Sequence, residues 1–93
     1  MAAALHVLTG ASRGMGAAMA EQLLKPGHVL LCISRHTRDS LDTLAREAGA
    51  RCEQWAMDLS DPRPVAQRLA DWLAEQAGPS FQRVALINNA GVI

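Results

Sequence analysis

Four short apolar runs, separated by three segments with helical spacing, constrain the fold of this chain more than any other feature. The expected strands are Leu5–Thr9, His28–Ile33, Arg51–Met57 and Val84–Ile87. Because strands that alternate with helices over short connections form a parallel sheet with right-handed crossovers, the order β-α-β-α-β-α-β predicts an α/β fold. We expect a Rossmann-type doubly wound sheet with strand order 3-2-1-4.

The boundaries of the helical segments follow from capping and breaking residues. The first is expected over Met15–Lys25, before Pro26 and Gly27. The second begins with Asp39 or Ser40 as its cap and closes at Gly49. The third has Asp61 as its cap and Pro62 in its first turn, and it ends at Gly78 and Pro79. The residues at helical spacing along it are Val65, Leu69, Trp72, Leu73 and Gln76.

The predicted strand order leaves one side of the sheet incomplete. The first two helices cover one face, and the third alone covers the other. We therefore expect half of the second face to be bare and the fourth strand to be an exposed edge. This pattern is that of the N-terminal half of a doubly wound domain, and such a piece is expected to self-associate through the face around the third helix and fourth strand.

Composition limits the classes of function. The chain has 93 residues and a formal net charge of zero, which indicates one small domain without the basic surface that nucleic acids need. No apolar run is long enough for a membrane span, and no basic segment precedes the first apolar run, so we expect a cytoplasmic protein. Cys32 and Cys52 are expected to be small buried hydrophobic residues.

Other polar and aromatic residues are expected to be structural. His6 and His28 lack partners at metal-ligand spacing, so we predict no metal site. Trp55 and Trp72 are expected to pack in the core rather than to stack on bases. Glu47, Glu53 and Glu75 are interpreted as a solvated face.

A glycine-rich turn follows the first apolar run directly. Gly10, Gly14 and Gly16 have the spacing G-x-x-x-G-x-G, and the wide first gap lets Ser12 and Arg13 project. The first glycine allows a tight turn, the second a close approach of the backbone to a pyrophosphate, and the third close packing of the helix. An ordinary small-residue loop between a strand and a helix is the alternative.

Three motifs in this order give the chain a family resemblance. They are Thr9-Gly10-Ala11-Ser12-Arg13-Gly14-Met15-Gly16, Asp58-Leu59 and Asn88-Asn89-Ala90-Gly91. Together they resemble the short-chain dehydrogenase/reductase family over essentially the whole chain. Within the family, Pro26-Gly27 and Ser34-Arg35 are most similar to sepiapterin and benzil reductases.

The resemblance implies a role for each matching residue. Gly10, Gly14, Met15 and Gly16 would line the cofactor pyrophosphate. Asp58 would accept a hydrogen bond from the adenine amino group, and Leu59 would add a backbone contact. Asn89, Ala90 and Gly91 would follow the adenosine ribose towards the nicotinamide. A helix-capping role is the alternative for Asp58.

The end of the second strand predicts NADP rather than NAD as the cofactor. An NAD site has an acidic residue there to hold the ribose 2′-hydroxyl. This chain has Ser34 and Arg35 instead, and its next acid is Asp39. Arg35 and Arg13 would bind the 2′-phosphate, with hydroxyl donors from Ser12 and Ser34. Arg38 is interpreted as a solvated surface charge.

The resemblance also implies hydride transfer between NADP(H) and a carbonyl or alcohol substrate. In the family a Tyr, a Lys four residues later and an upstream Ser carry the proton chemistry. This sequence holds no Tyr, and its single Lys, Lys25, lies beside a helix-ending Pro. No residue is therefore assigned a catalytic role, and the chain is expected to be the inactive N-terminal part of a longer, homo-oligomeric reductase. A non-catalytic nucleotide-binding module and a self-association module stay open as alternatives.

Overall fold

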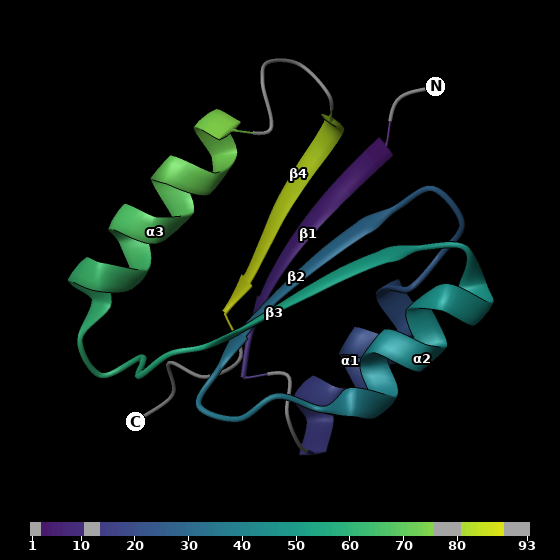
Figure 1. Ribbon diagram of the computed structural model, residues 1–93, viewed down its shortest axis with the longest axis horizontal. Helices are drawn as coiled ribbons and strands as arrows, with labels where there is room; N and C mark the ends of the chain where they lie inside the picture. Colours follow the sequence, from purple (N-terminus) through teal and green to yellow (C-terminus); the bar gives the residue numbers. More distant parts are fainter. Residues whose placement is uncertain (1–2, 11–13, 76–80, 89–93) are drawn as a thin grey trace.

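The computed structural model describes residues 3–10, 14–75 and 81–88, and within them strands and helices alternate as the sequence predicts (Figure 1). The elements are β1 (Ala3–Thr9), α1 (Gly14–Leu23), β2 (Val29–Ser34), α2 (Asp39–Ala48), β3 (Arg51–Ala56), α3 (Pro62–Glu75) and β4 (Phe81–Asn88). Strands β1 and β4 are longer than expected, while α1 ends two residues before Lys25.

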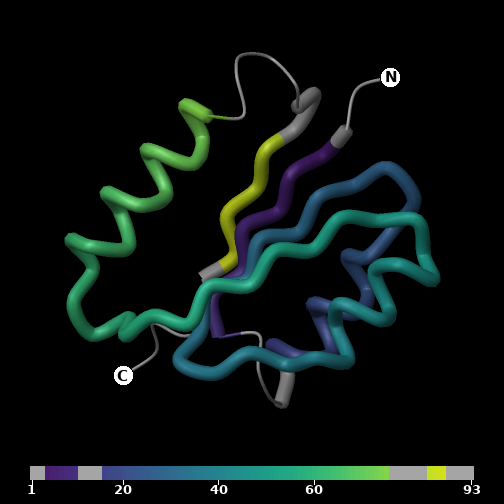
Figure 2. The backbone as a smooth tube through the Cα atoms, in the orientation of Figure 1, coloured from purple at the N-terminus to yellow at the C-terminus, as the bar shows by residue number. Residues whose placement is uncertain are grey.

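The four strands form one parallel sheet in the order β3-β2-β1-β4, as predicted. Strand β1 lies in the middle, with Val7 opposite Leu31 of β2 and Leu86 of β4. Helices α1 and α2 lie on one side of the sheet and α3 on the other (Figures 1 and 2). Since the order reverses around β1, the turn after β1 lies at the switch point where doubly wound sheets bind ligands.

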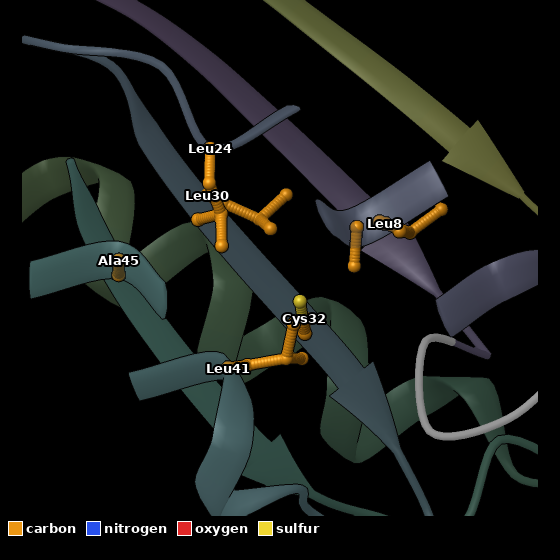
Figure 3. Packing of buried hydrophobic residues seen from close by; sticks show 7 residues of the cluster. Leu8, Leu24, Leu30, Cys32, Leu41 and Ala45 are labelled. Carbon is orange, nitrogen blue, oxygen red and sulfur yellow. The ribbon is translucent and has the colours of Figure 1, made fainter. Parts of the chain in front are cut away.

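The face under α1 and α2 is a closed hydrophobic core (Figure 3). Alternate residues of β1 and β2 point to this side, and the small residues of α1 let the helix approach them. The buried members of this first cluster are Leu8, Ala20, Leu24, Leu30, Cys32, Leu41 and Ala45. The side chains of Leu8, Leu30 and Leu41 are fully buried here, so this face contributes substantially to stability through apolar burial.

The face under α3 is a second hydrophobic cluster, whose buried members are Leu5, Val7, Val29, Leu31, Ile33, Trp55 and Trp72. Trp55 of β3 and Trp72 of α3 meet edge to face with ring centroids 6.0 Å apart, and both are buried as expected. The Trp72 indole N–H donates to Glu53 Oε2 at 3.0 Å, and the Trp55 indole N–H donates to Glu53 Oε1 at 3.4 Å. The interpretation of Glu53 as a solvated residue was wrong, because its carboxylate is the shared acceptor that pins α3 to the sheet.

Strand β4 is covered on one side only. Ile87 packs against the first cluster, whereas Val84 and Leu86 face the α3 side and are 58% and 67% exposed. Leu5 and Val7 point to that same side from β1 and are buried. The expected bare half of the second face is therefore confirmed over the described part of β4.

Helix α2 is capped differently from the prediction. Its N-cap is Arg38, with Asp39 in the first turn. The Arg38 backbone N–H donates to Gln54 Oε1 at 2.9 Å, and Gln54 Nε2 donates back to the Arg38 carbonyl at 2.7 Å. Gln54 of β3 therefore fixes the residue that precedes α2, and the expected Asp39 or Ser40 cap was wrong, because no side-chain cap hydrogen bond is made at the Arg38 N-cap. Gly49 closes the helix in the left-handed conformation, at φ 73°, as predicted.

Arg38 is also not the solvated surface charge that its sequence position suggests. Its side chain is largely covered, and Nη2 pairs with Glu21 Oε2 of α1 at 3.3 Å. The residue therefore joins α1 to the start of α2.

Helix α3 begins as predicted, with Pro62 as its first residue. Asp61 precedes it and accepts a hydrogen bond from the Arg63 backbone N–H at 3.4 Å, in the manner of a cap. Gln76, Gly78 and Pro79 lie outside the described residues. Within the described residues, none of the helices is both long enough and apolar enough to cross a membrane.

Candidate nucleotide-binding site

The turn after β1 leaves the sheet at its centre. Gly10 has φ 73°, a left-handed conformation that glycine adopts without the steric cost of a side chain. Its backbone N–H donates to the Ile33 carbonyl of β2 at 3.0 Å. The chain is therefore fixed between β1 and β2 where it turns towards α1.

Helix α1 begins at the same edge of the sheet, with Gly14 as its first residue. The first N–H groups of a helix have no partner within the helix, so they favour a bound anion. Gly16 is buried, as expected of a glycine that lets the helix pack closely. Of the predicted site residues, Ser12, Arg13, Asn89, Ala90 and Gly91 lie outside the described residues, and Gly14 and Met15 are placed by their backbone.

The carboxyl end of β2 presents a basic residue. Ser34 is the last residue of the strand and is buried, while Arg35 follows it with its side chain 72% exposed. Asp39 stands in the first turn of α2. The strand end at which NAD sites have an acid therefore carries an exposed guanidinium.

Arg35 and Asp58 come together at the carboxyl edge. Asp58 follows β3, the neighbour of β2, and its Oδ1 lies 3.8 Å from Nη2 of Arg35. Both side chains are mostly exposed, so water screens the pair and a ligand can replace either partner. The structure thus brings two predicted site residues together, from different strands.

Asp58 is held by a serine that the sequence analysis did not single out. The Ser60 backbone N–H and hydroxyl both donate to Asp58 Oδ1, at 2.9 Å and 2.8 Å. These two bonds, with a smaller effect from Arg35, hold the pKa of Asp58 below its ordinary value. Aspartate followed two residues later by a donor is a known turn signal, so the D-x-S spacing predicts this arrangement.

The alternative role of Asp58 as the cap of α3 is not seen, because Asp61 makes that contact. Leu59 packs against the cluster under α3, together with Met57. This anchors the loop that carries Asp58 to the body of the sheet. The carboxylate therefore stands on a short, well-fixed loop at the same edge as Gly10 and Arg35.

Comparison with known proteins gives a consistent result. The family model for short chain dehydrogenases matches residues 5–93. Benzil reductase of Bacillus cereus is 30% identical over 94% of this chain and 35% of its own length. Sepiapterin reductase of Xenopus laevis is 41% identical over 96% of this chain and 36% of its own length. The chain thus spans about a third of the length of the curated relatives it matches.

Solved structures agree with the sequence matches. A short-chain dehydrogenase/reductase from Burkholderia vietnamiensis superimposes with a TM-score of 0.75 at 38% identity, over 97% of this chain and 42% of that one. L-sorbose reductase from Gluconobacter frateurii, solved with NADPH and L-sorbose, gives a TM-score of 0.73 at 27% identity, over 98% of this chain and 34% of that one.

Proposed function

The chain belongs to the short-chain dehydrogenase family, and we propose that residues 1–93 are the NADP-binding N-terminal part of a Rossmann-type domain. The parent protein would be an oxidoreductase that moves a hydride between NADP(H) and a carbonyl or alcohol substrate. The nicotinamide supplies the hydride chemistry when it is bound. This chain's own residues would bind and orient the cofactor, and with no tyrosine among them we expect no turnover from the chain alone.

The choice of NADP depends above all on Arg35. Its guanidinium is exposed at the carboxyl end of β2, with only a screened contact to Asp58. A ribose 2′-phosphate carries nearly two negative charges and accepts charge-assisted hydrogen bonds from guanidinium groups. An NAD ribose would offer this arginine no charged partner. Arg13 is proposed as the second phosphate ligand, and Ser12 and Ser34 as hydroxyl donors.

The remaining proposed contacts are made by residues at the carboxyl edge of the sheet. Gly10, Gly14, Met15 and Gly16 would hold the pyrophosphate through the backbone of the turn and the start of α1. Asp58, kept anionic by Ser60, would accept a hydrogen bond from the adenine amino group. Leu59 would add a backbone contact while its side chain packs against the cluster under α3, and Asn89, Ala90 and Gly91 would follow the ribose.

Three related proteins support the proposal. The Gluconobacter frateurii enzyme was solved with NADPH, and the other two are named as reductases, of benzil and of sepiapterin. NADPH binding and reductase activity are properties of those proteins. For this chain, the choice of NADP is tested by the following binding experiment.

The test compares NADPH and NADH binding to the chain and to the double variant Arg13→Ala, Arg35→Ala. A hydrogen bond to a charged group contributes about 1.5–3 kcal/mol, so NADPH affinity should fall at least about tenfold while NADH affinity changes little. Arg51→Ala is the matched control, since Arg51 is also exposed and paired, with Glu53 at 3.5 Å, but lies at the opposite end of the sheet. An equal loss for both cofactors would exclude the 2′-phosphate role.

A second candidate function is self-association, and the exposure of Val84 and Leu86 on β4 is the observation that favours it. Leu73 of α3 adds an exposed apolar side chain. In a dimer, each copy would cover the exposed apolar side chains of the other. Sedimentation at several concentrations tests this candidate, and a monomer throughout the range would exclude it.

A further inference from the structure

The loop after β3 is anchored on both sides of Asp58. The Met57 backbone N–H donates to the Ser34 carbonyl of β2 at 2.8 Å, and the side chains of Met57 and Leu59 pack against the cluster under α3. Asp58 between them is exposed. Its carboxylate therefore has a fixed place at the carboxyl edge of the sheet and is still open to a ligand.

The two oxygens of this carboxylate differ in their partners. Ser60 donates to Oδ1 twice, from its backbone N–H at 2.9 Å and from its hydroxyl at 2.8 Å. Nη2 of Arg35 lies 3.8 Å from that same oxygen, which is longer than a hydrogen bond. Oδ2 accepts no hydrogen bond from the residues that the structure describes. Since each carboxylate oxygen has about two lone pairs, Ser60 fills the acceptor capacity of Oδ1 and leaves that of Oδ2 for a ligand.

The chemistry of Oδ2 distinguishes between two kinds of purine. The backbone and hydroxyl bonds from Ser60 hold the pKa of Asp58 below its ordinary value, and an ionised carboxylate accepts hydrogen bonds but donates none. The exocyclic amino group of adenine would donate to Oδ2. Hypoxanthine and guanine carry an oxygen in place of that amino group, so they would set one acceptor against another.

We propose that Ser60 is a positioning residue that makes this loop selective for adenine over purines with an oxygen in place of the amino group, because it turns Oδ2 of Asp58 towards the base. The inference rests on the proposed function, since it takes the base of a dinucleotide to lie at this edge. It assigns the choice of base to a residue that contacts only Asp58. Arg35 and the glycine-rich turn have no part in that choice, so base selectivity and the choice between NADP and NAD are separable properties.

The experiment measures the affinity of the chain for adenosine 2′,5′-bisphosphate and for inosine 2′,5′-bisphosphate, in which an oxygen replaces the amino group of the base, by calorimetric titration at pH 7. The wild type should bind the adenosine compound at least about tenfold more tightly. The inosine compound loses a hydrogen bond to a charged group and sets its oxygen against a carboxylate. Equal affinity for the two compounds would overturn the inference.

Ser60→Ala should reduce the ratio of the two affinities about threefold, since the backbone N–H of residue 60 still donates to Oδ1. Ser60→Thr keeps the hydroxyl and should restore the ratio. Ser40→Ala, on the exposed first turn of α2, is the matched control and should leave the ratio unchanged. A merely structural role of Ser60 would weaken the binding of both compounds equally, and an unchanged ratio in Ser60→Ala would contradict the positioning role.

Asp58→Asn tests the same oxygen with Ser60 left in place. An amide donates as well as accepts, so this variant should lose the preference for the adenosine compound, and a wild-type ratio would show that Asp58 does not read the base. Failure of the proposed function has a different signature. If the wild type binds neither compound and no NADPH, the proposed function and this inference both fail. If it binds NADPH more tightly than NADH but does not discriminate between the two bases, only this inference fails.

Discussion

Helices cover the two faces of the sheet to different extents. Under α1 and α2, side chains from two helices and two strands interlock, and Leu30 and Leu41 are fully buried. Under α3, a second buried cluster extends from β1 through β2 to β3, where Trp55 and Trp72 share Glu53 as an acceptor. Beyond this contact, Val84 and Leu86 of β4 face solvent.

This difference shows how unevenly stability is distributed in the chain. The closed face depends on area and close packing, which are lost in proportion to the volume that is removed. The open face has a buried apolar cluster of its own, to which the Trp55–Trp72 contact and the Glu53 carboxylate add directed interactions. The candidate cofactor edge lies at the carboxyl ends of β1, β2 and β3.

Leu30→Ala should have the largest effect on stability. Leu30 is fully buried in the first cluster, and removing such a side chain costs about 2–5 kcal/mol through lost burial and a residual cavity. Urea unfolding followed by circular dichroism measures the change. A cost below about 1 kcal/mol would mean that Leu30 is not packed as tightly as its full burial indicates.

Trp72→Phe should have an intermediate effect. Phenylalanine keeps most of the ring contact with Trp55 but lacks the N–H that donates to Glu53. The lost hydrogen bond to a charged group predicts a loss of about 1–3 kcal/mol. Urea unfolding of Trp72→Phe and of Glu53→Gln, which keeps an acceptor oxygen, measures it. A loss larger than that of Leu30→Ala would reverse the ranking of the two faces.

Ser60→Ala should act on the loop that leads to the open face, through Asp58. Because the folded pKa of Asp58 is below its unfolded value, ionised Asp58 contributes stability above the ordinary aspartate pKa, and this contribution disappears as the pH falls through the folded value. Removing the hydroxyl should move the Asp58 pKa upwards, as followed by carboxyl-carbon NMR titration. Because the backbone N–H of residue 60 still donates to Asp58, the Asp58 pKa should rise only part of the way to the ordinary aspartate value. An unchanged pKa would show that the Ser60 hydroxyl has no effect on Asp58.

Leu86→Ala should have the smallest effect on the folding of the single chain. The side chain is largely exposed on β4, and surface substitutions usually change stability within about 0.5 kcal/mol. If self-association occurs, it should weaken in the same variant. A loss comparable to that of Leu30→Ala, measured in dilute solution, would mean that the β4 side of this face is covered after all.

Most of the architecture was predictable from the sequence. Four apolar runs and their turn residues predicted the strand order, the closure of α2 by Gly49 and the exposed side of β4, because alternation and parallel pairing leave few arrangements. The family was predictable from the three motifs, and the similarity to sepiapterin and benzil reductases from Pro26-Gly27 and Ser34-Arg35. Both predictions are confirmed.

Contacts between distant residues were not predictable in this way. Arg38, Glu53 and Gln54 look like surface residues in the sequence, yet each makes a contact across elements that only the fold brings together. At the candidate site, the Arg35–Asp58 contact likewise required the three-dimensional arrangement, while the proposed cofactor roles stay predictions.

The most direct test of the central claim is calorimetric titration of the 93-residue chain with NADPH and, separately, with NADH. The exposed Arg35 at the end of β2 predicts saturable heat with NADPH and markedly weaker binding of NADH. Equal affinity for the two cofactors, or tighter binding of NADH, would contradict the assignment of this edge as an NADP site.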